Sequence, residues 1–459
     1  MSAILWKIIK SLILLYLIYV LVSGLLIFYV TSPKAAKPQA AEFQETSESI
    51  ALIDDVEEAW QARVDLISQA KETLDISYYA LHGGETVDEF LGLIIDAANR
   101  GVKVRFMLDS IAHGLWLKPS LYKAIAQHPN IDFAYYEPLN LLIPISWHHR
   151  LHDKIILVDN EIAMMGGRNI GDKYFTHQTK STSIDRDVIL FPGADGKHVL
   201  IQQISDYFNQ LWTSPHNFVQ GPEYTDSTLA QTSQFQLELA QEAKQSNPGD
   251  PSLKVWRERA VPIHRGYLIS NPLKRGFNEP TVWSNMLYLM QQAEDNILVQ
   301  SPYVIPSSQM RADLKFNHQE FADVDINLLS NSLASSNNIL ANSGYQNNRQ
   351  AILEQGIHLY EFQPREAQLH TKAIVIDERI SAVGTFNIDS RSTYLNTESM
   401  LVIDSPEFTA KLLDDLRTRY DDQIEAISPA GEDPSAPPFF KKFLVTILRP
   451  LATLFTPLL

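Results

Sequence analysis

The stretch His152-Asp153-Lys154-Ile155-Ile156-Leu157-Val158-Asp159 decides the fold of this chain, because its pattern returns as His370-Thr371-Lys372-Ala373-Ile374-Val375-Ile376-Asp377. In each copy one residue separates a histidine from a lysine, and an aspartate follows the lysine by five positions. Apolar residues fill the space between lysine and aspartate. The sequence therefore predicts one structural unit that occurs twice.

The repeat continues past the aspartate. At matching offsets come Gly166, Gly167 and Asn169 in the first copy, and Gly384, Thr385 and Asn387 in the second. A glycine-rich turn lets the backbone approach a ligand closely, and an asparagine adds a neutral hydrogen-bond donor. Core packing does not explain polar residues at identical offsets, so the repeat indicates a site.

The residue types indicate phosphate chemistry. Strand alternation puts His152 and Lys154 on one face, and likewise His370 and Lys372. Two such halves facing each other surround a tetrahedral anion with two imidazoles and two ammoniums. One imidazole can attack phosphorus while the other moves the proton, and the lysines and asparagines stabilise the phosphoryl oxygens. This chemistry needs no metal or other cofactor.

The remaining acids have two predicted roles. Asp159 and Asp377 fall at the turns of predicted hairpins, which favours a structural role although both belong to the motifs. A carboxylate bonded to the far ring nitrogen would orient each histidine. We predict Glu398 for His370 and Asp187 for His152.

Helix and strand patterns alternate on both sides of the motifs, as in helix 56–70, strand 73–81, helix 87–100 and strand 102–109. This order predicts an α/β fold of two similar α/β/α sandwich domains related by a pseudo-twofold axis. The predicted divisions are a membrane anchor and stem (1–45), a first domain (46–219), a connection with one helix (220–262), a second domain (263–425) and a tail (426–459).

Both ends of the chain indicate a membrane. The uncharged run Ser11–Val30 is long enough for a helix of roughly 30 Å, which favours an uncleaved transmembrane anchor over a signal peptide. Lys7 and Lys10 favour a cytoplasmic N-terminus and an extracytoplasmic body. After the Pro-rich stretch 434–438, the basic and apolar segment 439–459 either lies on a lipid surface or packs back on the globule.

Composition limits the other classes. The net charge of −16 argues against a nucleic-acid partner. The absence of cysteine excludes disulfides and thiolate chemistry. His148 and His149 lie near His152, but no acid at helical spacing accompanies them, so we predict no metal site.

The two motifs resemble those of the phospholipase D superfamily, over about residues 51–423. Further stretches resemble bacterial cardiolipin synthases of the C type: Gly166-Gly167-Arg168-Asn169-Ile170-Gly171-Asp172-Lys173-Tyr174-Phe175, Asn331-Ser332-Leu333-Ala334, Gly344-Tyr345, Phe386-Asn387-Ile388-Asp389-Ser390-Arg391-Ser392 and Asn396-Thr397-Glu398. The resemblance implies transfer of a phosphatidyl group between phospholipids at a bacterial inner membrane, with a periplasmic body. It implies His152 as nucleophile and His370 as acid and base, although the symmetry allows the reverse.

The resemblance also implies substrate contacts for Gly167, Thr385, Asn331 and Tyr345. The chain departs from the usual serine of the glycine-rich element at Gly167 and Thr385. It also has Asn338 and Asn342 where relatives often carry aspartate and histidine. If this loop binds the second substrate, the difference affects which acceptor is used. The alternatives are a phospholipase that uses water, a nuclease of the same fold and a non-catalytic lipid-binding scaffold. Two intact motifs disfavour the scaffold, and the acidity and the anchor disfavour the nuclease.

Overall fold

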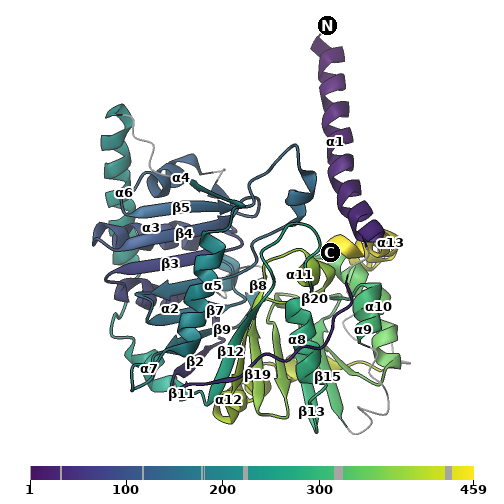
Figure 1. Ribbon diagram of the computed structural model, residues 1–459. Helices are drawn as coiled ribbons and strands as arrows, with labels where there is room; N and C mark the ends of the chain where they lie inside the picture. Colours follow the sequence, from purple (N-terminus) through teal and green to yellow (C-terminus); the bar gives the residue numbers. More distant parts are fainter. Residues whose placement is uncertain are drawn as a thin grey trace.

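The computed structural model describes residues 2–31, 34–115, 118–176, 179, 181–220, 226–314, 324–428 and 437–459 (Figure 1). Two nine-stranded sheets, one from each half of the chain, form its centre. The first sheet has the spatial order β10 (Asn217–Gln220), β5 (Ile131–Tyr136), β4 (Lys103–Asp109), β3 (Thr73–Tyr78), β6 (Ile155–Val158), β7 (Ile162–Gly166), β9 (Asp187–Phe191), β2 (Ser49–Ile53) and β11 (Val261–Pro262).

The second sheet repeats this order when it is read from the opposite edge. It runs β1 (Gln44–Glu45), β12 (Arg265–Ser270), β21 (Ser399–Asp404), β19 (Ile380–Gly384), β18 (Ala373–Ile376), β13 (Asn296–Gln300), β15 (Asp325–Asn331), β16 (His358–Phe362) and β22 (Ile424–Ala426). In both sheets a parallel trio, β3-β4-β5 or β13-β15-β16, joins the antiparallel hairpin that follows the motif. The halves also exchange ends, since β1 pairs with β12 and β11 pairs with β2.

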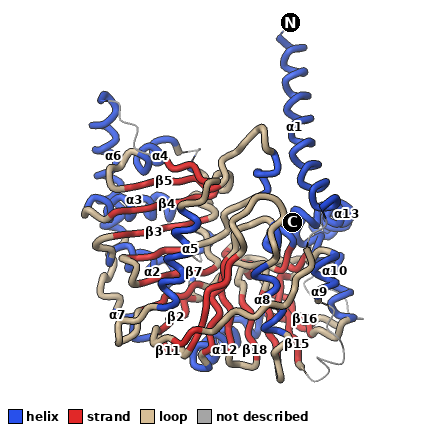
Figure 2. The backbone as a smooth tube through the Cα atoms, in the orientation of Figure 1, coloured by secondary structure: helices blue, strands red, loops and turns tan. Residues whose placement is uncertain are grey.

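Helices pack on both faces of each sheet (Figure 2). The first half has α2 (Val56–Gln69), α3 (Glu85–Asn99), α4 (Pro119–Ala126) and α5 (Val199–Trp212), and the second has α8 (Thr281–Met290), α9 (Ser308–Asp313), α10 (Ile339–Glu354), α11 (Ser390–Tyr394) and α12 (Pro406–Tyr420). The inner sheet faces share one core, in which Leu157 and Met165 join Val375 and Leu401, with α5 and α12. The two halves therefore fold into one body with a shared interior.

The predicted hairpins are present, and their aspartates have structural contacts. Asp159 (φ 53°) and Asp377 (φ 50°) occupy the turns in left-handed conformation. The Asp159 carboxylate accepts the backbone N–H groups of residues 71–73, and that of Asp377 accepts those of residues 294–296. Each aspartate thus ties the hairpin turn to the start of the neighbouring strand, β3 or β13.

The connection 220–262 differs from the prediction of one helix. Its described part contains α6 (Asp226–Ser246) and α7 (Lys254–Arg259). Helix α6 packs against α3 at Gly92, where an added Cβ would lie 2.6 Å from the Leu239 carbonyl oxygen. This segment therefore adds a helix to the outer layer of the first half, because its buried alanines, Ala240 and Ala243, complete that core.

The N-terminal helix α1 (Ser2–Thr31) projects from the body (Figure 1). Its residues Ile4–Leu25 are long and apolar enough to cross a membrane, and most of them are exposed. Its C-terminal part packs on the body, where the Val20 carbonyl oxygen lies 3.1 Å from His148 Nε2 and Phe28 is buried. Helix α1 therefore extends the predicted anchor by several residues at its start.

The C-terminal segment forms helix α13 (Phe439–Phe455) and the 3-10 turn η5 (Thr456–Leu458). One side packs on the body, where Arg449 donates to the Asn347 side chain and Val445 and Ala452 are buried. The other side exposes a row of apolar side chains: Phe439, Phe440, Phe443, Ile447, Leu451 and Leu454. Of the Pro-rich stretch 434–438, residues 434–436 lie outside the described residues.

Candidate active site

The backbone N–H of each motif histidine donates to a residue of the opposite half. His152 lies just before β6, and its N–H donates to Thr397 Oγ1 at 2.9 Å. His370 lies just before β18, and its N–H donates to the Ile184 carbonyl at 2.6 Å. The short strands β8 (Thr182–Ile184) and β17 (Ala367–Leu369) pair across the halves immediately before His370. Both histidines therefore depend on the interface for their position.

The carboxylates that orient the histidines also cross the interface, which corrects both predicted pairings. Glu398 does not bind His370: its Oε2 lies 2.9 Å from Nδ1 of His152. The reason is that Glu398 directly follows Thr397, which bridges to Leu151 of the first half. The residue was identified correctly, but its partner was wrong.

Asp187 does not bind His152 either. It opens β9 and its carboxylate is used inside the first half, 2.9 Å from Arg63 and 3.0 Å from Arg168. The counterpart of Glu398 is Asp185, whose Oδ2 lies 2.5 Å from Nδ1 of His370. Asp185 lies between β8, which pairs with β17 of the second half, and β9, which pairs within the first half. Its side chain therefore reaches the second half, whereas that of Asp187 remains in the first.

The two lysines lie beside their histidines, fully buried. Lys154 Nζ donates to the His152 carbonyl oxygen, and Lys372 Nζ donates to the His370 carbonyl oxygen. Lys372 also lies 3.5 Å from Asp185 Oδ2. Burial and the nearby Lys372 lower the pKa of Lys154 to about 7, and burial lowers that of Lys372 despite Asp185. The site thus buries two lysine ammonium groups next to the two histidines.

Burial and the lysines keep both imidazoles neutral. They lower the pKa of His370 to about 3 and that of His152 well below its usual value. Burial raises the pKa of Glu398 to about 7, whereas Lys372 and His370 overcome burial and hold the pKa of Asp185 below its usual value. A neutral imidazole that donates Nδ1–H to a carboxylate presents Nε2 with its lone pair, as a nucleophile or base requires.

A cavity of about 380 Å³ lies between the histidines. Asn169 and Asn387 line it, as predicted, and the Asn387 Oδ1 is buried without a hydrogen-bond partner among the described residues. Three tyrosines, none of them predicted as a site residue, surround the imidazoles. The ring centroid of Tyr79 lies 5.1 Å from that of His152, and those of Tyr174 and Tyr303 lie 5.8 and 6.2 Å from that of His370.

Gly167 and Thr385 lie behind the orienting carboxylates and are absent from the described cavity wall, and the substrate contacts predicted for them stay predictions. Thr385 Oγ1 donates to Glu398 Oε2 at 2.5 Å. A Cβ added at Gly167 would lie 2.1 Å from Asp185 Oδ1. The glycine therefore makes room for Asp185, and the threonine holds Glu398.

Asn331 and Tyr345 are also absent from the described wall of this cavity, and the substrate contacts predicted for them stay predictions. Asn331 exchanges hydrogen bonds with the backbone of Leu369, next to His370. The Tyr345 hydroxyl donates to Glu361 at 2.7 Å. The cavity wall instead includes Asn338, Lys173 and Arg391. The quoted stretches around Asn169 and Asn387 contain the last two, but spacing alone does not show which side chains face inward.

His148 and His149 make backbone contacts. His148 binds the Val20 carbonyl of α1, and His149 Nδ1 lies 3.1 Å from the Leu395 carbonyl oxygen while Nε2 accepts the Gly276 N–H. These contacts fix the segment before His152 against α1 and the second half.

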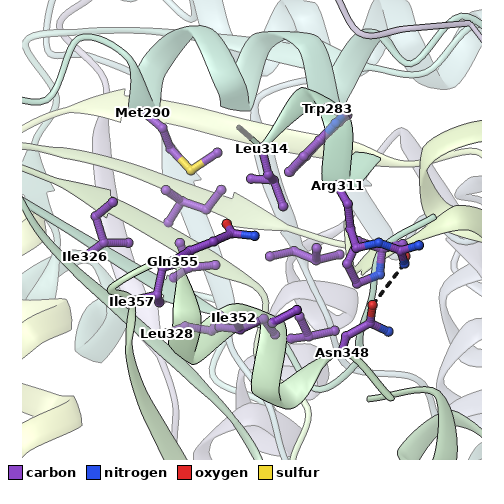
Figure 3. Close-up of a pocket in the computed structure, with 16 residues that line it drawn as sticks. Trp283, Met290, Arg311, Leu314, Ile326, Leu328, Asn348, Ile352, Gln355 and Ile357 are labelled. Atoms are coloured by element: carbon purple, nitrogen blue, oxygen red, sulfur yellow. Dashed lines mark hydrogen bonds between the residues drawn. The ribbon is translucent and has the colours of Figure 1, made fainter. Parts of the chain in front are cut away.

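A separate apolar cavity lies in the second half, between α8, α9, α10 and the sheet (Figure 3). Its described lining includes Trp283, Met290 and Ile357 and no motif residue, and Arg311 is bonded there to Asn348 at 3.0 Å. Its volume of about 50 Å³ is far below the roughly 300–1,000 Å³ of ligand pockets. It is a packing defect of the core and takes no part in the site.

Comparison with known families agrees with this geometry. The model of the family described as "Cardiolipin synthase, PLD-like domain" matches residues 64–212 and 286–419, one stretch in each half. The chain belongs to this family. It is therefore an enzyme of the phospholipase D superfamily, with the cardiolipin synthase-like domain present twice.

Named relatives are similar along most of their length. The chain is 27% identical to cardiolipin synthase C of Escherichia coli (strain K12), over 79% of this chain and 83% of that protein. It is 25% identical to an uncharacterized protein of Helicobacter pylori (strain J99), over 79% of this chain and 77% of that protein. Among solved structures, phosphatidylserine synthase of Haemophilus influenzae has the same fold, with a TM-score of 0.65, 14% identity, and coverage of 91% of this chain and 97% of that one.

Proposed function

We propose that this protein is a cardiolipin synthase that transfers a phosphatidyl group from one phospholipid to the hydroxyl of another through a phosphohistidine. One observation carries the proposal: two neutral imidazoles, each oriented by a carboxylate of the opposite half, line one cavity with two lysines behind them. This is the arrangement that a two-step displacement at phosphorus requires.

In the first step Nε2 of His152 attacks the phosphorus of the donor lipid. A P–N bond forms and the bond from phosphorus to the head-group oxygen breaks. His370, which takes up a proton on Nε2 as the anionic donor lipid binds beside it, gives that proton to the leaving alcohol. Lys154, Lys372, Asn169 and Asn387 stabilise the charge on the phosphoryl oxygens. We assign the nucleophile to His152 on the family resemblance. Because the two halves are nearly symmetric, the assignment is tested by trapping the phosphatidyl adduct and finding which histidine carries it.

In the second step the hydroxyl of the acceptor lipid attacks the same phosphorus. The new P–O bond forms as the P–N bond to His152 breaks, and the hydroxyl proton passes to His370. Both histidines end in their starting protonation states, so the cycle needs no further reactant. Water in place of the lipid hydroxyl would give phosphatidic acid, which is the competing hydrolase outcome.

The membrane elements favour a lipid acceptor. The last residues of the C-terminal segment, Leu458 and Leu459, line the catalytic cavity directly after α13, whose outer side is apolar. Leu141 and Leu142, on the loop before His148, are also exposed, and Tyr16 of α1 donates to the Leu141 carbonyl. We propose that these elements hold the cavity mouth at a bilayer, with the anchor in a bacterial inner membrane and the body in the periplasm, as Lys7 and Lys10 favour.

The test is lipid mass spectrometry on cells that lack their own cardiolipin synthases. The wild-type chain and His152→Ala are expressed in parallel, and both cardiolipin and phosphatidic acid are measured. We expect cardiolipin with the wild type and none with the variant. Phosphatidic acid without cardiolipin would identify a phospholipase, and no change in either lipid would contradict lipid chemistry altogether.

A further inference from the structure

Two cations outside the repeated motifs line the catalytic cavity. Lys173 and Arg391 each follow the motif asparagine, Asn169 or Asn387, by four positions, so they occupy corresponding places in the two halves. Lys173 lies on the short 3-10 turn η3 (Asp172–Tyr174), and Arg391 lies on α11. Neither side chain takes part in the proposed reaction steps.

The two cations differ in what they already bind. Arg391 donates from Nη1 to the His148 carbonyl at 3.1 Å and from Nε to the Leu458 carbonyl at 3.2 Å. It therefore joins the C-terminal segment to the loop beside α1. The Lys173 ammonium lies over the Tyr174 ring, 4.9 Å from its centroid, and has no hydrogen bond or ion pair within the described parts of the chain.

Lys173 differs from the deeply buried arginines of this protein in having no carboxylate partner within the described residues. The net charge is −16, and the most deeply buried arginines pair with carboxylates: Arg63 and Arg168 with Asp187, Arg150 with Asp109, and Arg186 with Asp54. Lys173 is partly buried, and burial lowers its pKa. A cation that loses solvation without gaining a partner is costly, unless a ligand supplies the negative charge.

Lys173 lies on the His370 side of the cavity. Its neighbour Tyr174 has its ring centroid 5.8 Å from that of His370 and 5.7 Å from that of His82. Burial and then the Lys173 charge lower the pKa of His82 to about 3, so His82 stays neutral beside the ammonium. In the proposed reaction the acceptor enters on this side, because it attacks phosphorus in line with the bond to His152 and passes its proton to His370.

A phospholipid acceptor brings a second phosphate into the cavity, in addition to the one that reacts. We propose that Lys173 binds the phosphodiester of the acceptor phospholipid and so selects a lipid alcohol over water. The bonds of that phosphodiester stay intact, since only the acceptor hydroxyl gains a bond to phosphorus and only the P–N bond breaks. This inference rests on the proposed function. Lys173 makes a charge-assisted contact that a neutral acceptor cannot use.

The experiment compares acceptors with and without a phosphate. The full chain is placed in vesicles of phosphatidylethanolamine and phosphatidylglycerol with added ethanol, and cardiolipin and phosphatidylethanol are measured together. We expect Lys173→Gln to lower the ratio of cardiolipin to phosphatidylethanol at least about tenfold, as the loss of a charge-assisted contact implies. Lys173→Arg, which keeps the charge, should restore most of the ratio.

Arg391→Gln is the matched control, since it removes a cation from the corresponding position. We expect it to lower both products together, because it loosens the C-terminal segment. An unchanged ratio in Lys173→Gln, or an equal fall of the ratio in Arg391→Gln, would overturn the subsite. Glycerol 3-phosphate as acceptor separates lipid from soluble phosphate: a defect of Lys173→Gln with this acceptor alone would overturn the lipid assignment. Failure of the proposed function is seen separately, as a wild-type chain that makes no cardiolipin.

Discussion

The two halves of the molecule use different residues to position the carboxylate that orients a motif histidine. In the first half Gly167 leaves room for the short side chain of Asp185, which crosses to His370. In the second half Thr385 holds the longer Glu398, which crosses to His152. The pKa of Asp185 is below its usual value and that of Glu398 is raised to about 7. The fold is therefore nearly symmetric, but its electrostatics are not, which agrees with the different roles proposed for the two histidines.

The largest effect is expected from removing either histidine. His152→Ala and His370→Ala should each lower transfer by roughly 10³-fold or more, because each deletes the nucleophile or the acid and base. The two variants then differ in what they trap. Mass spectrometry of intact His370→Ala after mixing with donor lipid should show a phosphatidyl adduct on His152. An adduct found only on His370, in the His152→Ala chain, would reverse the assignment.

The next effect tests the packing difference directly. Gly167→Ser should lower activity about 100-fold and cost roughly 1–3 kcal/mol of stability, because its Cβ would collide with the Asp185 carboxylate. Thr385→Ser keeps the hydroxyl that binds Glu398 and should change activity less than about threefold. Steady-state rates and thermal unfolding are measured for both. Equal tolerance of the two substitutions would mean that the halves are interchangeable at these positions.

The sequence was sufficient for the fold and for most of the residues that the structure gathers at the candidate site. Exact repetition of offsets identified the two histidines, lysines and asparagines, and apolar alternation located the hairpins, whose turns fall at Asp159 and Asp377 as expected. These features are local, since a hairpin and a turn depend on neighbouring residues.

The orienting pairs could not be assigned from sequence, because they depend on how the halves meet. Glu398 follows the second motif closely along the chain but binds the histidine of the first. Asp185 and Asp187 differ by two positions, and only the cross-half pairing of β8 with β17 shows which of them reaches His370. Contacts across a pseudo-twofold interface invert the assignment that proximity in sequence suggests.

The pH dependence separates the two carboxylates. Below pH 7 Glu398 gains a proton and no longer accepts the Nδ1–H of His152, so activity should fall as the pH decreases. Above pH 7 Lys154 loses its proton and its stabilisation of the phosphoryl oxygens, so activity should fall again. The profile of kcat/KM should therefore be bell-shaped around pH 7.

Variants assign each limb of this profile. Glu398→Gln should lower the rate and flatten the acid limb, and Lys154→Arg should move the alkaline limb upward. Asp185→Asn should lower the rate by a similar factor without changing the acid limb, because Asp185 stays ionised well below pH 7. If the acid limb disappears in Asp185→Asn, the group that titrates on this limb is Asp185 and not Glu398.

The smallest effect concerns the membrane side, where α13 belongs to the second half and ends at the cavity. The double variant Phe439→Gln, Phe443→Gln removes two exposed aromatic side chains, each contributing roughly 1.5–3 kcal/mol if buried in lipid. Because α1, the proposed membrane anchor, is unchanged in this variant, we expect the transfer rate in vesicles to fall only about twofold to fivefold. Leu237→Gln, on the exposed face of α6 at the far end of the molecule, is the control and should change nothing (Figure 1). The same double variant assayed in detergent micelles should match the wild type, since no bilayer is then present for α13 to hold; an equal loss in micelles would mean that the phenylalanines support the fold instead.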